Sequence, residues 1–590
     1  MQRTFESPSE SALARVFTGQ RAAKGVVWFS LPGGRPLFRK GQAADTLYFL
    51  RSGRLAVSRE GEDGKPHLIG VIRPGEPAGE MALIADAPHT ATITALRDSE
   101  VLALSRDAFL AEARRHPEVM AELARLMVLR TRKNHTPEGV SEPTVYGFAG
   151  VAPGAQVRTL VEDIAACALE MGVSAIVVGS ENEHQTAEWF TRIEQGHDLV
   201  LLAAESGEVE WARLAARQVD RLFLVGRGDQ TPPETLPEVA KVSVQLQRLT
   251  DLILIQRETA ERPSGSAAWV EAFQPQRLFQ VRKGRRDDVR RMARVVSGAS
   301  IGLALSGGGA RAYAHVGVLQ AMKEAGEPID FIAGASMGAI VAAGVAMGWP
   351  LEEVTERIRK AFVSSNPLAD IDLPLVAMTK GLDVSRRLKE HFGDVDIADL
   401  WLPFFCTSSN LTTARAFVHQ KGLVRRALRA SAALPGILPP VAFGADVLVD
   451  GAVMCNLPTE LMRAQHRGPV IGVDVAVSEG LSASDIERPP STWKWLLSGE
   501  WRRGPPIVSI LIRAATAPTA RETAQSHEAA DLLIIPEIKG VELRDWRAFD
   551  PAVAGGYSAA KLAFDRLERP LTQVRLHRKP PVQTLFDAPD

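Results

Sequence analysis

A serine between two glycines is the strongest chemical feature of this 590-residue sequence. The pentapeptide Gly334-Ala335-Ser336-Met337-Gly338 follows an apolar run suited to a buried strand, Ile329–Ala333, and precedes one suited to a buried helix, Ala339–Met347. A serine on so sharp a strand-to-helix turn is held in strained backbone geometry, and bulky neighbours two positions away would clash. The helix N-terminus also favours negative charge that develops beside it. The pattern predicts Ser336 as a nucleophile supported by Gly334 and Gly338; a tight turn with an incidental serine is the alternative.

A glycine-rich loop, Ser306-Gly307-Gly308-Gly309-Ala310-Arg311, follows the apolar run Ile301–Leu305. Glycines expose backbone N–H groups, which can bind an oxyanion in a tetrahedral transition state. We expect such an oxyanion hole here, with Arg311 fixing or polarising the loop. A plain turn is one alternative. A dinucleotide-binding fingerprint is another alternative, since Gly307-x-Gly309-x-x-Ala312 fits GxGxxG/A. That fingerprint requires Asp330 to end a second strand, whereas Asp330 starts the apolar run that leads into Ser336.

An aspartate, Asp450, ends a third apolar run, Val447–Val449, and precedes Gly451-Ala452. A carboxylate in this position is well placed to project into a site. Asp-Gly is also a common turn-forming pair, so this signal gains weight only beside the other two motifs.

In this order, the three motifs resemble those of the patatin-like phospholipases. The resemblance covers residues 301 to about 475, and its matching segments are SGGGAR at 306–311, GASMG at 334–338, DGA at 450–452, Arg429-Ala430-Ser431, Pro435-Gly436 and Pro439-Pro440. The domain order resembles the neuropathy target esterase type, in which barrel domains and a divergent α/β stretch precede the patatin domain. The family more often has DGG, but a methyl group at Ala452 leaves the acid in place.

The resemblance implies an enzyme that hydrolyses lipid esters, with a phospholipid or lysophospholipid as substrate and no metal or cofactor. It implies a dyad in which Ser336 attacks the carbonyl and Asp450 takes its proton, then activates water on an acyl-enzyme. Gly307, Gly308 and Gly309 would form the oxyanion hole. A non-catalytic ligand-sensing regulatory protein and a nucleotide-dependent enzyme are the alternatives.

A Ser-Asp-His triad is a further alternative, because both His466 and His527 satisfy the chain order Ser, acid, His. His466 lies in the polar stretch AQHRGP and His527 in the polar helical stretch ETAQSHEAAD. We interpret both as surface histidines, whereas a base must lie within hydrogen-bond reach of the serine. The place of SGGGAR directly before the nucleophile unit, as in patatins, favours the dyad.

Length and composition predict the architecture that must position these residues. At roughly 150 residues per domain, the chain predicts three or four domains. A net charge of −1 with 24% charged residues gives no overall field for nucleic acid or an anionic membrane. Three widely spaced cysteines argue against a disulfide framework or zinc site and fit a reducing cytoplasm. The N-terminus lacks a signal-peptide pattern.

We therefore predict a multidomain fold. Short apolar runs between Gly and charged turns indicate a β-barrel, and apolar runs alternating with amphipathic stretches indicate α/β domains. The uncharged run Phe331–Pro350 has the length of a membrane span, but its composition predicts a buried strand and helix. The predicted parts are a cyclic-nucleotide-binding-like barrel with helices at 1–134, an α/β domain of unknown role at 144–258, a basic helical linker at 259–300, a patatin-like α/β hydrolase domain at 301–570 and a loose tail at 571–590.

The barrel resembles cyclic-nucleotide-binding domains, with GEMAL at 79–83 and PHTAT at 88–92 in place of the phosphate cassette. In binding members of that family, Glu80 would hold the ribose hydroxyl and an arginine would stand at the position of His89. Neutral imidazole offers one donor and no charge, so losing the charged bidentate pair should cost a few kcal/mol. The cassette favours a degenerate regulatory or docking barrel over a tight cyclic nucleotide sensor.

Two stretches are candidates for peripheral membrane contact of a cytoplasmic protein. The first is a basic run from Arg282 to Arg294, for which a solvated helix is the favoured interpretation. The second pairs tryptophans with cations, a combination typical of the bilayer interface; its residues are Trp493, Lys494, Trp495, Trp501, Arg502 and Arg503.

Overall fold

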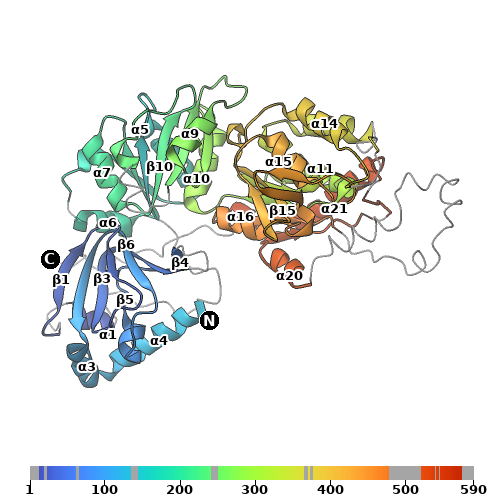
Figure 1. The fold of residues 1–590 in the computed structure, drawn as a ribbon. Helices are drawn as coiled ribbons and strands as arrows, with labels where there is room; N and C mark the ends of the chain where they lie inside the picture. Colours follow the sequence, from blue (N-terminus) through green and yellow to red (C-terminus); the bar gives the residue numbers. More distant parts are fainter. Residues whose placement is uncertain are drawn as a thin grey trace. The chain divides into compact units, whose positions relative to one another are not determined.

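Three sheets follow one another along the chain in the computed structural model (Figure 1). The structure describes residues 12–18, 23–60, 66–133, 144–185, 187–240, 250–364, 370–371, 376–476, 520–538, 540–543 and 545–573. Two compact units divide the chain: Met1–Gly226, Pro233–Leu252 and Arg578–Asp590 form one, and Arg227–Pro232 and Ile253–His577 form the other. The tryptophan cluster at 493–501 lies outside the described residues.

The first sheet is antiparallel and confirms the predicted N-terminal barrel. Side chains of the strand Thr92–Ser105 alternate between buried and half-buried along most of its length, as expected for a sheet with one face in the core. The strands are β1 Val27–Leu31, β2 Pro36–Phe38, β3 Thr46–Glu60, β4 Pro66–Ile72, β5 Pro77–Ala78 and β6 Thr92–Ser105, and their order is β1-β6-β3-β4, with β2 on β6 and β5 on β3. The helices are α1 Ala12–Phe17, α2 Glu80–Ala85, α3 Arg106–Arg115 and α4 Pro117–Lys133.

The second sheet is the predicted middle α/β domain, in the order β12-β11-β10-β7-β9-β8. Strands such as β9, LVLLAA, are continuous apolar runs with every residue buried, which suits a parallel sheet covered on both faces. The elements are β7 Val145–Gly150, α5 Val157–Glu170, β8 Ala175–Val178, α6 Ala187–Gly196, β9 Leu199–Ala204, α7 Val209–Gln218, β10 Arg221–Arg227, β11 Thr250–Gln256, α9 Ser266–Phe273, β12 Leu278–Arg282 and α10 Arg286–Ser297.

The segment 259–300, expected to be a basic linker, contributes α9, β12 and α10. Its basic run is not a solvated helix, because several of its cations are buried or paired. Arg291 is 5% exposed, Arg282 donates to Asp288, and Arg294 donates to Asp330. The run was misread because its cations have carboxylate partners close by, and one of them, Asp330, lies 36 residues away in sequence.

The third sheet builds the C-terminal domain, in the order β17-β18-β15-β14-β13-β19-β20, with β16 on β15. Strands β13, β14, β15, β19 and β20 are parallel, so their carboxyl ends meet at one edge. The strands are β13 Gly302–Leu305, β14 Phe331–Ala335, β15 Phe404–Asn410, β16 Arg415–His419, β17 Val441–Phe443, β18 Asp446–Asp450, β19 Val470–Val473 and β20 Leu532–Ile534.

Helices cover this sheet and bury a large apolar core. They are α11 Ala314–Ala325, α12 Ser336–Ala346, α13 Leu351–Ile358, α14 Leu382–Phe392, α15 Val424–Ser431, α16 Thr459–Gln465, α20 Ala520–Glu528 and α21 Phe549–Asp565. The run Phe331–Pro350 forms β14 and α12, and most of its residues are buried, as predicted. Among the described residues, no helix is long and apolar enough to cross a membrane.

Candidate active site

Ser336 occupies a sharp turn between β14 and α12. Its φ of 52° lies in the left-handed region, which non-glycine residues rarely adopt without a functional reason. Both flanking glycines are required by close packing. A methyl group on Gly334 would lie 2.6 Å from the Ala339 nitrogen, and one on Gly338 would lie 2.4 Å from the Ser306 carbonyl oxygen. The predicted strand, turn and helix are therefore all present.

Asp450 ends β18 and meets the serine directly. The Ser336 hydroxyl donates to Asp450 Oδ2 at 2.7 Å, and the Ala452 N–H donates to Oδ1 at 2.9 Å. Strand register explains the encounter, because β14 pairs Ala335 with Thr407 of β15, while β15 pairs the next residue, Ser408, with Asp450. Strand pairing thus brings the hydroxyl of Ser336 and the carboxylate of Asp450, 114 residues apart in sequence, to one level of the sheet.

Burial tunes the carboxylate of Asp450, which is 1% exposed. Loss of hydration raises its pKa to about 6, although the hydrogen bonds from Ala452 and Ser336 act in the opposite direction. A group with this pKa is mostly ionised at neutral pH yet basic enough to accept a proton. It can therefore act as a general base toward the hydroxyl that it already contacts.

A relay of hydroxyl and carbonyl groups fixes the turn. The Ser336 N–H donates to Ser431 Oγ at 2.9 Å, and the Ser431 hydroxyl donates to the Thr407 carbonyl at 2.6 Å. The Ser409 hydroxyl donates to the Asp450 carbonyl at 2.8 Å. Sequence reasoning gave none of these residues a role. The available signal was Ser431 in the RAS segment, which was noted only as part of the resemblance.

The glycine loop lies against the nucleophile. A methyl group on Gly307 would lie 2.9 Å from Ser336 Cβ, so the loop could not approach the serine with a larger residue. The Gly307 N–H donates to Asn456 Oδ1 at 3.0 Å and is therefore engaged. Among the described residues, no hydrogen bond is formed by the N–H groups of Gly308 and Gly309. Gly309 has a φ of 54°, and a methyl group there would lie 2.2 Å from the Leu543 carbonyl oxygen.

Arg311 holds the glycine loop in place from the interior. It is 8% exposed and donates through Nε to the Val475 carbonyl at 2.9 Å and through Nη1 to the Val541 carbonyl at 3.0 Å. Behind it, fully buried His315 places Nε2 2.8 Å from the Ser306 carbonyl oxygen. Burial lowers the pKa of His315 to about 4, so this imidazole is neutral at physiological pH. Arg311 thus ties the loop to the backbone at Val475 and Val541.

The two histidines of the triad alternative lie away from the serine. His466 stacks on Phe331, the first residue of β14. At about 3.3 Å per residue along a strand, Phe331 is roughly 16 Å from Ser336. The prediction that His466 is a surface residue is wrong, since it is 4% exposed, and burial lowers its pKa to about 3. His527 is partly exposed and lies 2.9 Å from Asp474. Asp474 follows β19, two strands from β14, or roughly 10 Å across the sheet.

The barrel cassette is occupied by internal contacts. Arg130 of α4 donates to Glu80 at 2.6 Å and also reaches Glu76 at 3.3 Å. His89 is 5% exposed and stacks on Phe38 with ring centroids 3.6 Å apart, and burial lowers its pKa. The two cassette side chains singled out from the sequence are therefore a paired carboxylate and a neutral, stacked imidazole.

Three family models match consecutive parts of this chain. Residues 28–116 match the cyclic nucleotide-binding domain, residues 154–274 match the neuropathy target esterase family P-loop like domain, and residues 303–463 match the patatin-like phospholipase. The second match extends past the predicted end of the middle domain at 258. It includes α9, in agreement with the observed fold.

The chain is similar to relatives over most of its length. An uncharacterised NTE family protein of Mycobacterium tuberculosis is 29% identical over 564 residues, which cover 92% of this chain and 93% of that protein. The patatin-like phospholipase domain-containing protein 6 of Homo sapiens is 27% identical and covers 91% of this chain, which spans only 44% of the human protein. The catabolite activator protein of Thermus thermophilus is 27% identical over 25% of this chain and 62% of that one, with a TM-score of 0.18.

The sheet, the glycine loop and the three matches define the class of the molecule: it is an enzyme with a patatin-like phospholipase domain. More specifically, it is a patatin-like phospholipase of the neuropathy target esterase type, with an N-terminal cyclic-nucleotide-binding-like domain. The predicted domain order and family are confirmed.

Proposed function

We propose that this chain hydrolyses carboxylic esters of phospholipids or lysophospholipids through a Ser336–Asp450 dyad and an acyl-enzyme. The observation that carries the proposal is the 2.7 Å hydrogen bond from the Ser336 hydroxyl to a buried carboxylate whose pKa is raised to about 6. The strained turn supports it, because a left-handed serine at a helix N-terminus has an exposed Oγ beside favourable backbone dipoles.

In the first half-reaction, Ser336 Oγ bonds to the ester carbonyl carbon while its proton passes to Asp450 Oδ2. The carbonyl oxygen becomes an oxyanion, for which the donors are the N–H groups of Gly308 and Gly309, which no group in the described part of the chain engages. Collapse of this intermediate breaks the bond to the alcohol oxygen, which takes the proton from Asp450. The products are the free alcohol or lysolipid and acyl-Ser336.

In the second half-reaction, Asp450 removes a proton from water, and the hydroxide oxygen bonds to the acyl carbon. Collapse returns the proton to Ser336 Oγ and releases the fatty acid. The Gly307 N–H takes part only if a bound substrate displaces Asn456, whose Oδ1 it contacts at 3.0 Å.

A fluorophosphonate probe and hydrolysis of oleoyl lysophosphatidylcholine test the proposal together. Ser336→Ala should lose both labelling and essentially all turnover, whereas Ser385→Ala, a matched change at an exposed serine of α14, should behave as wild type. Removing a catalytic nucleophile typically costs several orders of magnitude, on the order of 10⁴-fold or more. Wild-type turnover by purified Ser336→Ala would refute the proposal.

A further inference from the structure

The peptide group between Ser306 and Gly307 is held at both of its polar atoms. Its carbonyl oxygen lies 2.8 Å from His315 Nε2, and its N–H donates to Asn456 Oδ1 at 3.0 Å. A carbonyl only accepts, so the imidazole proton is on Nε2. An N–H only donates, so the amide oxygen of Asn456 faces Gly307. Two side chains that are 141 residues apart in sequence thus clamp this one peptide.

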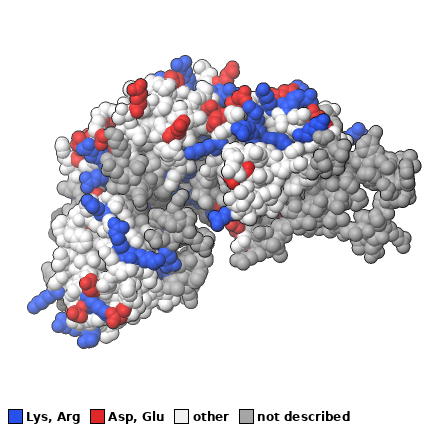
Figure 2. Space-filling view, in the orientation of Figure 1, with Lys and Arg blue, Asp and Glu red and all other residues white. Residues whose placement is uncertain are grey.

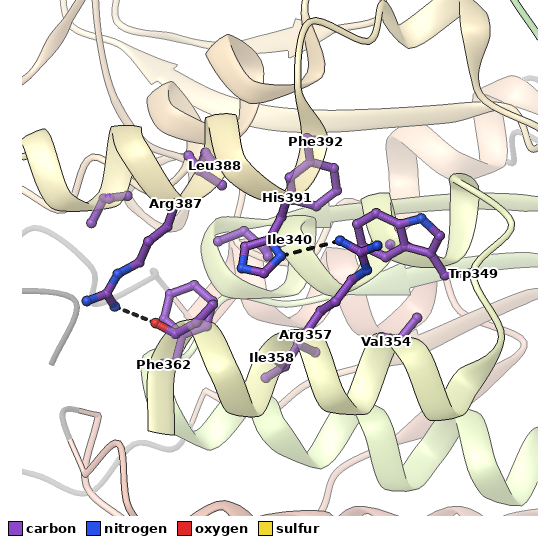
Figure 3. Close-up of a pocket in the computed structure, with 13 residues that line it drawn as sticks. Ile340, Trp349, Val354, Arg357, Ile358, Phe362, Arg387, Leu388, His391 and Phe392 are labelled. Atoms are coloured by element: carbon purple, nitrogen blue, oxygen red, sulfur yellow. Dashed lines mark hydrogen bonds between the residues drawn. The ribbon is translucent and has the colours of Figure 1, made fainter. Parts of the chain in front are cut away.

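The clamped peptide lies directly against the nucleophile turn. A methyl group on Gly338 would collide with the Ser306 carbonyl oxygen, and one on Gly307 would lie 2.9 Å from Ser336 Cβ. Ile340, two residues beyond Gly338 and so on nearly the opposite face of α12, packs in the apolar core among side chains of α13 and α14 (Figure 3). Because α12 is fixed on that face, a tilt of the clamped peptide would move the glycine loop relative to a stationary serine.

The other end of the glycine loop is fixed as well. The Ala310 N–H donates to the Leu543 carbonyl at 2.8 Å, and the Arg311 N–H donates to the Gly308 carbonyl at 3.1 Å. Between the two fixed ends lie the N–H groups of Gly308 and Gly309, which form no hydrogen bond within the described part of the chain. The direction of these two donors is therefore set by the clamped peptide on one side and by the Ala310 contact on the other.

Asn456 belongs to the loop that also supplies the base. This loop leaves β18 at Asp450 and is tightly wound, since the Cys455 N–H donates to the Gly451 carbonyl at 2.8 Å. The Thr407 hydroxyl of β15 donates to the Cys455 carbonyl at 3.0 Å, one residue before Asn456. One short loop thus holds a carboxylate against the serine hydroxyl and an amide against the glycine loop.

We propose that Asn456 is a positioning residue that, together with His315, clamps the Ser306–Gly307 peptide throughout the reaction, so that Gly308 and Gly309 alone donate to the oxyanion. Asn456 keeps its hydrogen bond to Gly307 and does not give way to the substrate. An oxyanion hole stabilises the transition state because its donors are in place before the charge develops, and the clamp supplies that preorganisation. This role rests on the proposed esterase function and acts through the loop, without contact with the substrate.

Turnover of oleoyl lysophosphatidylcholine by purified full-length variants tests the clamp. Asn456→Leu keeps the size of the side chain but removes the acceptor. Its kcat should fall at least about tenfold while KM changes by less than about twofold, because orientation of the donors affects the transition state. Fluorophosphonate labelling of Ser336 should slow by a similar factor, since the phosphonyl oxygen uses the same donors. The unfolding temperature of each variant separates loss of the fold from loss of orientation.

Asn456→Asp gives a readout that a merely structural role would not move. The introduced carboxyl keeps an acceptor for the Gly307 N–H, but in its ionised form it adds a negative charge beside the donors of the oxyanion hole. The ratio of variant to wild-type kcat should be below about one tenth at pH 8. It should rise at least about threefold at pH 5.5, where more of the introduced carboxyl is neutral.

Asn410→Asp is the matched control for this charge. The Asn410 amide oxygen accepts from the N–H groups of Thr412 and Thr413 and has no part in the clamp. Its ratio to wild-type kcat should therefore show no rise between pH 8 and pH 5.5. Figure 2 shows cations and anions intermixed over the visible face of the chain, so one added charge changes no dominant surface field.

His315 provides a second test of the clamp. His315→Gln places an amide N–H near the position of Nε2 and should retain most of the wild-type kcat, whereas His315→Leu removes the donor and should lose at least about tenfold. His315 is fully buried, so the leucine variant counts only if it folds. If it does not fold, the Asn456 variants decide.

Several results would overturn the assignment. Wild-type kcat in folded Asn456→Leu would show that the clamp is not needed, and an increased kcat would make the Gly307 N–H an oxyanion donor. A raised KM with unchanged kcat would make Asn456 a substrate-binding residue. A pH-independent ratio for Asn456→Asp, or an equal rise for Asn410→Asp, would leave Asn456 a merely structural role. Absence of labelling and turnover in the wild type would refute the proposed esterase instead, so the two failures are distinguishable.

Discussion

Asparagine in place of Asp450 should abolish catalysis and, at neutral pH, make the folded chain more stable. The native carboxylate is buried, and its pKa rises from the ordinary 3.8 to about 6. At 1.36 kcal/mol per pKa unit, this rise corresponds to about 3 kcal/mol of destabilisation once the group is ionised. Asparagine keeps the shape, but its amide can satisfy only part of the hydrogen bonding with Ser336 and Ala452, at a cost of about 1 kcal/mol. The expected gain is about 2 kcal/mol.

The gain should depend on pH in a defined direction. Between pH 3.8 and about 6 the folded chain binds more protons at Asp450 than the unfolded chain, so this carboxylate lowers stability as pH rises through that window. The advantage of Asp450→Asn should therefore be absent at pH 4 and complete at pH 8. For a domain of this size, about 2 kcal/mol corresponds to a rise of roughly 4–8 °C in the unfolding midpoint.

Calorimetry at pH 4 and pH 8, followed on the transition of the C-terminal domain, measures the stability effect. Wild-type kcat/KM on a short-chain ester should fall as pH decreases through about 6, because protonated Asp450 cannot accept the serine proton. Asp450→Asn should be nearly inactive at every pH. A lower midpoint for Asp450→Asn at pH 8, or wild-type activity unchanged between pH 8 and pH 5, would refute the reasoning.

Three further outcomes are expected. His527→Ala should keep most esterase activity. His466→Ala should also keep kcat, but its free energy of unfolding should fall by roughly 2 kcal/mol, because the change leaves a cavity beside Phe331. A loss of several orders of magnitude in kcat for either folded variant would favour a triad. Isothermal titration should show weak or absent binding of cyclic AMP and cyclic GMP to the barrel, where His89 replaces an arginine, and submicromolar affinity would contradict this. Vesicle sedimentation should show weaker binding when three tryptophans, Trp493, Trp495 and Trp501, are replaced together by alanine. Binding equal to that of the wild type would show that they are not an interfacial anchor.

The parts of the site that sequence could predict are those encoded locally. The strand, turn and helix around Ser336 need only neighbouring residues, and both glycines are explained by contacts within a short span or with the adjacent β13. The glycine loop was likewise recognisable, because the three consecutive glycines before Arg311 are unusual in themselves. The fold class could be predicted from the spacing of apolar residues, because strands and helices have different apolar periodicities.

The parts that sequence could not predict depend on partners far along the chain. Asn456 engages Gly307 across 149 residues, and Ser431 supports Ser336 across 95. His466 was misjudged because its flanking residues are polar, while the ring that buries it, Phe331, belongs to a distant strand. Such contacts depend on strand order and register, and periodicity alone carries no information about either.

Strand order also explains how the proposed mechanism could work without histidine. Histidine is the usual base because its unperturbed pKa is near neutrality, whereas an exposed aspartate is about two pKa units too acidic to take a serine proton efficiently. In this fold the register of β15 and β18 places Asp450 in a buried position, and burial raises its pKa to about 6 against the opposing hydrogen bonds from Ala452 and Ser336. A second side chain between acid and hydroxyl then becomes unnecessary, because Oγ and Oδ2 already lie 2.7 Å apart. The destabilisation that accompanies this buried charge is the measurable consequence, and it is why Asp450→Asn should separate stability from catalysis.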